Sequence, residues 1–118
     1  VPDLVAELQR NQEAMAASVV DNPRPAVVWD IAVHHADLHE ALGLGAPPEA
    51  MWRPVVDAIG PGRAPDLLDT VAPYELFRAM FSRRSRAQMQ AWGTDRDAAG
   101  LDELCIFGPR EDDQPLPA

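Results

Sequence analysis

Prolines and glycines divide this chain into short segments. The sequence has 12 prolines and 7 glycines in 118 residues, and many of them fall at 22–25, 45–48, 60–65 and 108–109. Proline removes a backbone donor and pushes the residue before it out of helical angles, so each cluster predicts the end of an element. Between the clusters, apolar residues recur every three or four positions, which is the period of an amphipathic helix. The sequence therefore predicts an all-α fold.

Four helices are expected between these breaks. They cover residues 3–19, 26–42, 49–59 and 73–92. Asp3 can cap the first helix, and Gly43 is a natural left-handed residue after the second. Pro54 lies inside the third helix, which is therefore either kinked or broken. The stretch 60–65 is expected to be a turn, and residues 94–100 are expected to form a loop.

The apolar positions predict which residues are buried. In the second helix, the residues that repeat on one face are Val27, Ile31, Leu38 and Leu42. In the last helix, the candidate core residues are Leu76, Phe77, Met80, Phe81 and Met89. Cys105 has apolar neighbours and no adjacent basic partner, so we expect a small buried side chain and not a reactive thiol. Residues 1–110 are expected to form a single helical domain, followed by an irregular, acidic and proline-containing tail at 111–118.

The charge balance restricts the kinds of partner. The formal net charge is −9, from 19 acidic and 10 basic residues, so the chain should repel nucleic acid and anionic membranes. No apolar run approaches the roughly 20 residues that cross a bilayer. One cysteine permits no internal disulfide, and nothing resembles a secretion signal, so we expect a soluble cytoplasmic protein. All 10 basic residues are arginine, a composition that indicates a high-GC, actinobacterial source.

The second predicted helix carries the candidate metal ligands. Asp30 and His34 are four residues apart, so their side chains project side by side and can approach one ion, and Asp37 extends the same stripe. His35 and His39 form another such pair about 100° further round the helix, too far to share that ion easily. A catalytic zinc normally takes three protein ligands, and an Asp–His pair at this spacing is often a plain surface contact. The spacing alone leaves metal binding open.

Several stretches of the chain resemble one enzyme family. They are PDLVAEL at 2–8, VHHADLHEALG at 33–43, YELFRAM at 74–80, SRRSRAQ at 82–88 and FGPR at 107–110. In this order along most of the chain, they are similar to signature stretches of the mycothiol-dependent maleylpyruvate isomerase family, part of the DinB-like metalloenzymes. The resemblance implies a DinB-like helical bundle. It also implies a thiol transferase or isomerase that acts on a small electrophilic molecule.

The resemblance also implies cofactors and ligands. A divalent metal, typically zinc, would lower the pKa of bound mycothiol and so supply a thiolate nucleophile. Asp30 and His34 stand at the positions of two metal ligands in the family. His35 and Asp37 would be the neighbouring groups that orient these ligands.

The arginine-rich stretch has two interpretations. Arg83 and Arg84 are candidates for binding an acidic substrate or a cofactor that carries carboxyl or sugar groups. The alternative, which the sequence alone favours, is that these arginines pair with nearby acids on a solvated helix face. Ser82, just before them, stands where the family motif has glycine.

The resemblance is incomplete in ways that suggest alternatives. The family's first metal histidine lies on a helix that would precede Val1, so the expected bundle is short of one helix and one ligand. Asp30 stands where glutamate or histidine is more usual. One alternative is a non-catalytic helical interaction or dimerisation module. Another is that a second chain, or a segment outside this sequence, supplies the missing helix. An incomplete bundle predicts exposed apolar surface around Ile31 and Leu38 and a homodimer.

Overall fold

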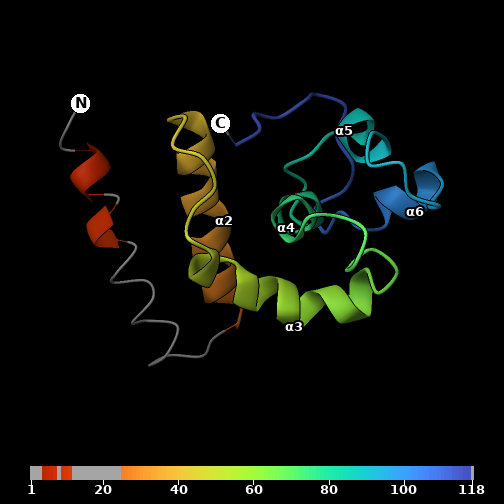
Figure 1. Ribbon diagram of the computed structural model, residues 1–118, viewed down its shortest axis with the longest axis horizontal. Helices are drawn as coiled ribbons and strands as arrows, with labels where there is room; N and C mark the ends of the chain where they lie inside the picture. The colour runs from red at the N-terminus through yellow and green to blue at the C-terminus, as the bar shows by residue number, and fades with distance from the viewer. Residues whose placement is uncertain (1–3, 8, 12–24, 118) are drawn as a thin grey trace.

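The computed structural model describes residues 4–7, 9–11 and 25–117 of the chain (Figure 1). The elements from residue 25 onward are α2 (Pro25–Ala41), the 3₁₀-helix η1 (Glu49–Met51), α3 (Arg53–Arg63), α4 (Pro73–Met80), α5 (Arg86–Gln90) and α6 (Ala98–Asp102). Residues 4–7 and 9–11 are also helical, and no described residue lies in a β-strand. The predicted all-α fold class is therefore confirmed.

The helices surround a core built mainly from α4. In Figure 1, α2 stands along one side, α3 runs away from one end of it, and α5 and α6 lie on the opposite side of α4. α3 packs against α4, and α5 packs against α6. The five core residues predicted in this region, Leu76, Phe77, Met80, Phe81 and Met89, are all buried. This part of the hydrophobic core follows directly from the apolar spacing.

The second predicted helix matches α2 within one residue at each end. Gly43 follows it with a φ of 66°, which confirms the left-handed position expected after the helix. The first predicted helix is described only at residues 4–7 and 9–11, which are helical. Its other positions lie outside the described residues, as does the side chain of Val27.

The predicted buried face of α2 is wrong. Leu38 is 46% exposed and Leu42 is 40% exposed, while Ala36 and Glu40 are buried. The side chain of Glu40 accepts hydrogen bonds from Arg78 on α4. Glu40 faces inward beside buried Ala32, Val33 and Ala36, and turning it outward would leave its buried arginine partners without a carboxylate.

The third predicted helix was expected to be either kinked or broken at Pro54, and it is broken. η1 ends at Met51 and α3 begins at Arg53, so Pro54 lies in the first turn of α3, where its missing N–H would have no partner in any case. The turn predicted at 60–65 is wrong over residues 60–63, because α3 continues to Arg63. Pro61 lies in the last turn and removes only one backbone hydrogen bond.

The last predicted helix, 73–92, is wrong as a single element. It is two helices, α4 and α5, separated by a turn in which Ser82 has a φ of 62°. Ser85 then caps α5 in a capping box with Gln88. Ser82 and the capping box together redirect the chain and end the continuous helix that the apolar period suggested.

The C-terminal region is more ordered than expected. The predicted loop 94–100 is wrong from Ala98 onward, because Asp97 accepts a hydrogen bond from the backbone N–H of Gly100 at 2.7 Å and caps α6. Cys105 is buried, as predicted, and burial raises the pKa of its thiol. The tail has no regular structure, but Gln88 donates to the backbone carbonyl of Gln114 at 2.8 Å and ties it to α5.

Candidate functional site

A buried ion network joins α2 to α4 and the turn after it. Glu40 is at its centre: Arg78 donates to its two carboxylate oxygens at 3.1 and 2.8 Å, and Arg84 donates to the same two oxygens at 3.1 and 3.4 Å. The hydroxyl of Tyr74 also donates to Glu40 at 2.7 Å. Burial alone would raise the pKa of Glu40, but the hydrogen bonds from Arg84 and Arg78 outweigh burial and hold that pKa below its usual value.

Two further acids complete the network. Asp37 accepts from Arg78 at 2.6 Å and from Arg83 at 3.0 and 3.2 Å. Glu75 accepts two hydrogen bonds from Arg84, at 2.8 and 2.7 Å. Arg84 is thus fully buried and held by acids on two helices. Arg84 therefore has a structural role, and it lines neither of the two cavities described in this section.

Asp30 and His34 lie outside this network. The Asp30 Oδ1 atom is 3.2 Å from His34 Nε2, and the two side chains are 73% and 62% exposed. The other ring nitrogen, Nδ1, is 3.4 Å from the Oδ2 atom of Asp37. The structure therefore brings three of the four predicted metal-site residues together on one side of α2, with Asp37 between the exposed pair and the buried network.

The spacing of the pair can be compared with that of metal ligands. Two ligand atoms on one tetrahedral zinc ion, each about 2.0 Å from it, lie about 3.3 Å apart. Asp30 Oδ1 and His34 Nε2 therefore match one edge of such a site. However, the described residues contain no group of three or more His, Cys, Asp or Glu side chains that could hold a metal ion. They supply a pair of ligands and not a complete site.

The pair lines a pocket of about 380 Å³. The apolar walls come from three parts of the chain: Trp29 and Val33 of α2, Phe81 after α4, and Ile106 and Phe107 after α6. The polar lining consists of Asp30, His34 and Arg83. We call this cavity the aromatic pocket. It holds three of the predicted site residues, and an apolar cavity with a few polar groups is the usual form of a small-molecule site.

His35 does not reach the aromatic pocket. It is buried on another side of α2, and its ring centroid is 4.9 Å from that of His39. Its Nε2 atom makes no hydrogen bond with any described residue. Burial and the neighbouring His39 lower the pKa of His35, so its neutral form is favoured. Its predicted role beside the metal ligands has no contact that supports it.

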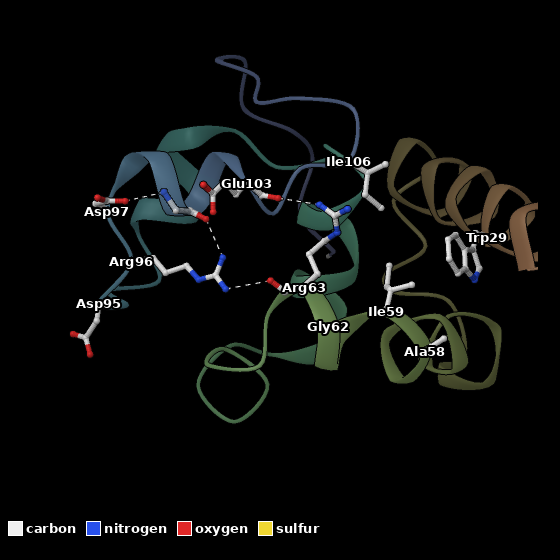
Figure 2. A pocket seen from close by; sticks show the side chains of 11 residues that line it. Trp29, Ala58, Ile59, Gly62, Arg63, Asp95, Arg96, Asp97, Glu103 and Ile106 are labelled. Carbon is white, nitrogen blue, oxygen red and sulfur yellow. Dashed lines mark hydrogen bonds between the residues drawn. The ribbon is translucent and has the colours of Figure 1, made fainter.

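A second, more open cleft lies beside the aromatic pocket (Figure 2). Trp29 and Ile106 line both cavities and form the wall between them. Arg63 donates to the backbone carbonyl of Glu103 at 2.9 Å. Arg96, at the end of the cleft away from Trp29, donates to the carbonyls of Gly100 and Arg63 at 2.9 and 3.2 Å. These arginines hold the end of α3 against α6.

Sequence reasoning missed the aromatic walls of the pocket. Trp29 and Phe107 are separated by most of the described chain, and only the turn after α6 brings Phe107 to α2. The resemblance of residues 107–110 to a family motif was the one signal that marked this segment. It did not indicate that Phe107 would line a cavity with Asp30 and His34.

Comparisons with known proteins add no family assignment. No protein-family model, no curated protein and no solved structure gives a significant match to this chain. In the part of the chain that the structure describes, no helix is long and apolar enough to cross a membrane. The fold and the pocket define an all-α protein with a small aromatic cavity beside an exposed acid–imidazole pair.

Proposed function

We propose that this protein is a metal-dependent thiol transferase or isomerase of the maleylpyruvate isomerase-like, DinB-like class, with mycothiol as its thiol. One observation carries the proposal. Asp30 and His34 lie 3.2 Å apart on the wall of the aromatic pocket, and both stay mostly exposed, outside the buried cluster around Glu40. They are thus available to bind a metal ion next to a cavity that suits a small electrophile. The motif resemblance supplies the thiol chemistry.

The residues of this chain have distinct tasks in the proposal. Asp30 and His34 would hold the metal, which when bound lowers the pKa of a thiol and makes it a nucleophile near neutral pH. Asp37, 3.4 Å from His34 Nδ1, favours a proton on that nitrogen and leaves Nε2 free to bind the ion. Arg78 and Arg83 fix Asp37 in turn. The aromatic walls offer an apolar surface to the substrate.

Completing the metal site takes a third ligand from outside the described residues. A zinc ion held by only two side chains binds weakly compared with one held by three. The homodimer alternative would supply the third ligand from a second copy. The exposed Leu38 on α2 and Leu42 just after it favour this alternative, because a second chain could cover them. Sedimentation of the purified chain over a range of concentrations tests this, and a monomer throughout would count against it.

Metal content is the direct test of the proposed function. The purified chain, prepared without chelators, should carry zinc or another divalent ion at a near-stoichiometric level in elemental mass spectrometry. An Asp30→Ala/His34→Ala double variant should lose the ion and keep its helical circular dichroism. The matched control is Asp57→Ala, which removes an exposed carboxylate of α3 far from the pocket lining. Equal metal in the double variant and the wild type would refute the Asp30–His34 assignment.

A second candidate function is a non-catalytic helical module that has kept the fold. The observation in its favour is that the described residues hold no group of three metal ligands. In addition, Arg78 and Arg84 of the motif stretches are used entirely in holding helices together. Under this alternative, the wild type and the double variant would both be free of metal, and neither would react a thiol with an electrophile.

A further inference from the structure

We infer that the aromatic pocket binds a molecule with a flat apolar body and one carboxylate, held by Arg83. This inference rests on the proposed function, because it names the substrate class for the same pocket. It depends on two features of the lining that metal binding does not require. One is the arrangement of the three aromatic rings, and the other is the hydrogen bonding of Arg83.

The aromatic rings form walls suited to a flat body. The Trp29 and Phe81 ring centroids are 6.4 Å apart with an interplanar angle of 68°, and those of Phe81 and Phe107 are 6.4 Å apart at 48°. Rings inclined in this way offer both faces and edges to an aromatic ligand. Phe107 is 70% exposed, so it contributes little to the core. A two-ring aromatic body fits a volume of about 380 Å³.

Among the described residues, Arg83 is the one arginine on the lining of this pocket. Its Nε and Nη2 atoms donate to the Asp37 carboxylate at 3.2 and 3.0 Å, and its Nη1 atom donates to the carbonyl of Phe81 at 2.8 Å. A guanidinium has five N–H groups. Two of them, one on each Nη, therefore have no acceptor among the described residues.

These two N–H groups match a carboxylate. The pair of terminal guanidinium N–H groups can hold both oxygens of a carboxylate in one plane. Asp37 and the Phe81 carbonyl already fix the orientation of Arg83, so little side-chain freedom is lost on binding. Asp37 also balances the charge of Arg83, so recognition depends on the directional hydrogen bonds and not on a diffuse positive field. The pocket should therefore distinguish a carboxylate from its neutral amide.

The probes are 2-naphthoate and its neutral counterpart 2-naphthamide, added to metal-free protein. Binding is followed by NMR, through the Trp29 indole N–H and the Phe107 backbone N–H. Naphthoate should shift both signals. Naphthamide should bind about tenfold more weakly, as expected for the loss of hydrogen bonds to a charged group. Equal affinity for the two probes, or no shift at Trp29, would overturn the inference.

Two variants and a control assign the effect. Arg83→Gln should reduce naphthoate affinity to that of naphthamide, and Phe107→Ala should weaken both probes. Arg53→Gln removes an exposed arginine that pairs with Glu49 and Asp57 and does not line the aromatic pocket. It should leave both affinities unchanged. If Arg83→Gln loses helical structure, the ratio of naphthoate to naphthamide affinity on the wild-type protein tests the inference instead. An unchanged ratio in folded Arg83→Gln would contradict the role of Arg83.

The probe experiment is independent of metal binding. Naphthoate selectivity in a protein that never binds metal would support the ligand class and remove the proposed thiol chemistry. Metal bound at Asp30 and His34 without naphthoate selectivity would support the proposed function and overturn the inference about Arg83.

Discussion

Two sides of α2 carry the same kinds of residue and use them differently. On the inner side, Glu40 is surrounded by three hydrogen-bond donors, two of them guanidinium groups, and is buried. On the outer side, Asp30 and His34 contact each other at 3.2 Å and stay exposed. The difference lies in what faces each group: α4 and the turn after it on one side, a pocket on the other.

The comparison separates residues that hold the fold from residues that are free to bind a ligand. A buried carboxylate is tolerated only when its partners satisfy it, so the partners of Glu40 serve to hold the fold. An exposed pair adds little stability and can exchange one contact for another. Asp37 stands at the boundary, because it contacts buried Arg78 and exposed His34. The predictions below test this division by stability and by metal or proton binding.

The largest expected effect is from Glu40→Ala. The change leaves two buried arginines without their shared carboxylate, so it should lower the free energy of unfolding by about 3–5 kcal/mol. Urea unfolding followed by circular dichroism measures it. The matched control is Glu49→Ala, which removes an exposed acid 2.9 Å from Arg53 and should change stability by less than about 0.5 kcal/mol. Similar losses in the two variants would mean that the inner network is not what stabilises α2.

Acid should weaken the same network by a smaller amount. The pKa of Glu40 in the folded protein lies below its ordinary value of 4.5. Its contribution is therefore complete above pH 4.5 and is lost as the pH falls through the lower, folded-state pKa. We expect the free energy of unfolding to decrease with acidification below that point. The loss should be smaller than in Glu40→Ala, because a protonated carboxyl group keeps its size and some hydrogen bonds.

A variant shows whether Glu40 is responsible. Glu40→Gln keeps the shape of the side chain but cannot titrate. Its unfolding free energy should depend less on pH below 4.5 than that of the wild type, as measured by urea unfolding at each pH. An identical pH dependence in the two proteins would assign the acid sensitivity to other carboxylates.

The extent of α2 could be predicted from sequence, but its buried face could not. The helical period and Gly43 gave its ends, since both are local signals. The inward direction depends on Glu40 meeting Arg78 and Arg84, which are 38 and 44 residues away. No local sequence pattern indicates a contact between residues so far apart along the chain. The leucine stripe of Leu38 and Leu42 therefore pointed to the wrong face.

The candidate site was predictable to a similar degree. The i, i+4 spacing of Asp30 and His34 indicated a pair, and the structure places the two side chains together. The pocket beside them depends on Phe107, which lies far along the chain and reaches α2 through the turn after α6.

The break between α4 and α5 could be predicted in part, because Ser85 and Gln88 have the spacing of a capping box. The uninterrupted apolar period concealed it.

A change of intermediate size is expected at Ser82, which sets the turn between α4 and α5. Its hydroxyl donates to the Gly108 carbonyl at 2.8 Å and accepts from the Phe107 N–H at 3.3 Å. Ser82→Ala loses both bonds and keeps the unfavourable φ of 62°, so it should lower stability by about 1–2 kcal/mol. Ser82→Gly loses the same bonds but removes the strain, and should be about 1 kcal/mol more stable than Ser82→Ala.

The same turn connects stability to the pocket. Because Ser82 holds the backbone of Phe107, Ser82→Ala should also reduce naphthoate binding, while Arg53→Gln should not. Chemical denaturation gives the stability difference, and NMR titration gives the binding. A Ser82→Gly variant less stable than Ser82→Ala would show that the left-handed conformation at this position is not strained.

The smallest effect on stability is expected from the outer pair. Asp30 and His34 are mostly exposed and make no buried hydrogen bond, so Asp30→Ala and His34→Ala should each change the free energy of unfolding by less than about 0.5 kcal/mol. The same variants should abolish metal retention in elemental mass spectrometry, a large functional effect with almost no structural one. A stability loss as large as that of Glu40→Ala would instead place the pair among the residues that hold the fold. The division between the two sides of α2 would then not hold, because both would serve to pack the helix.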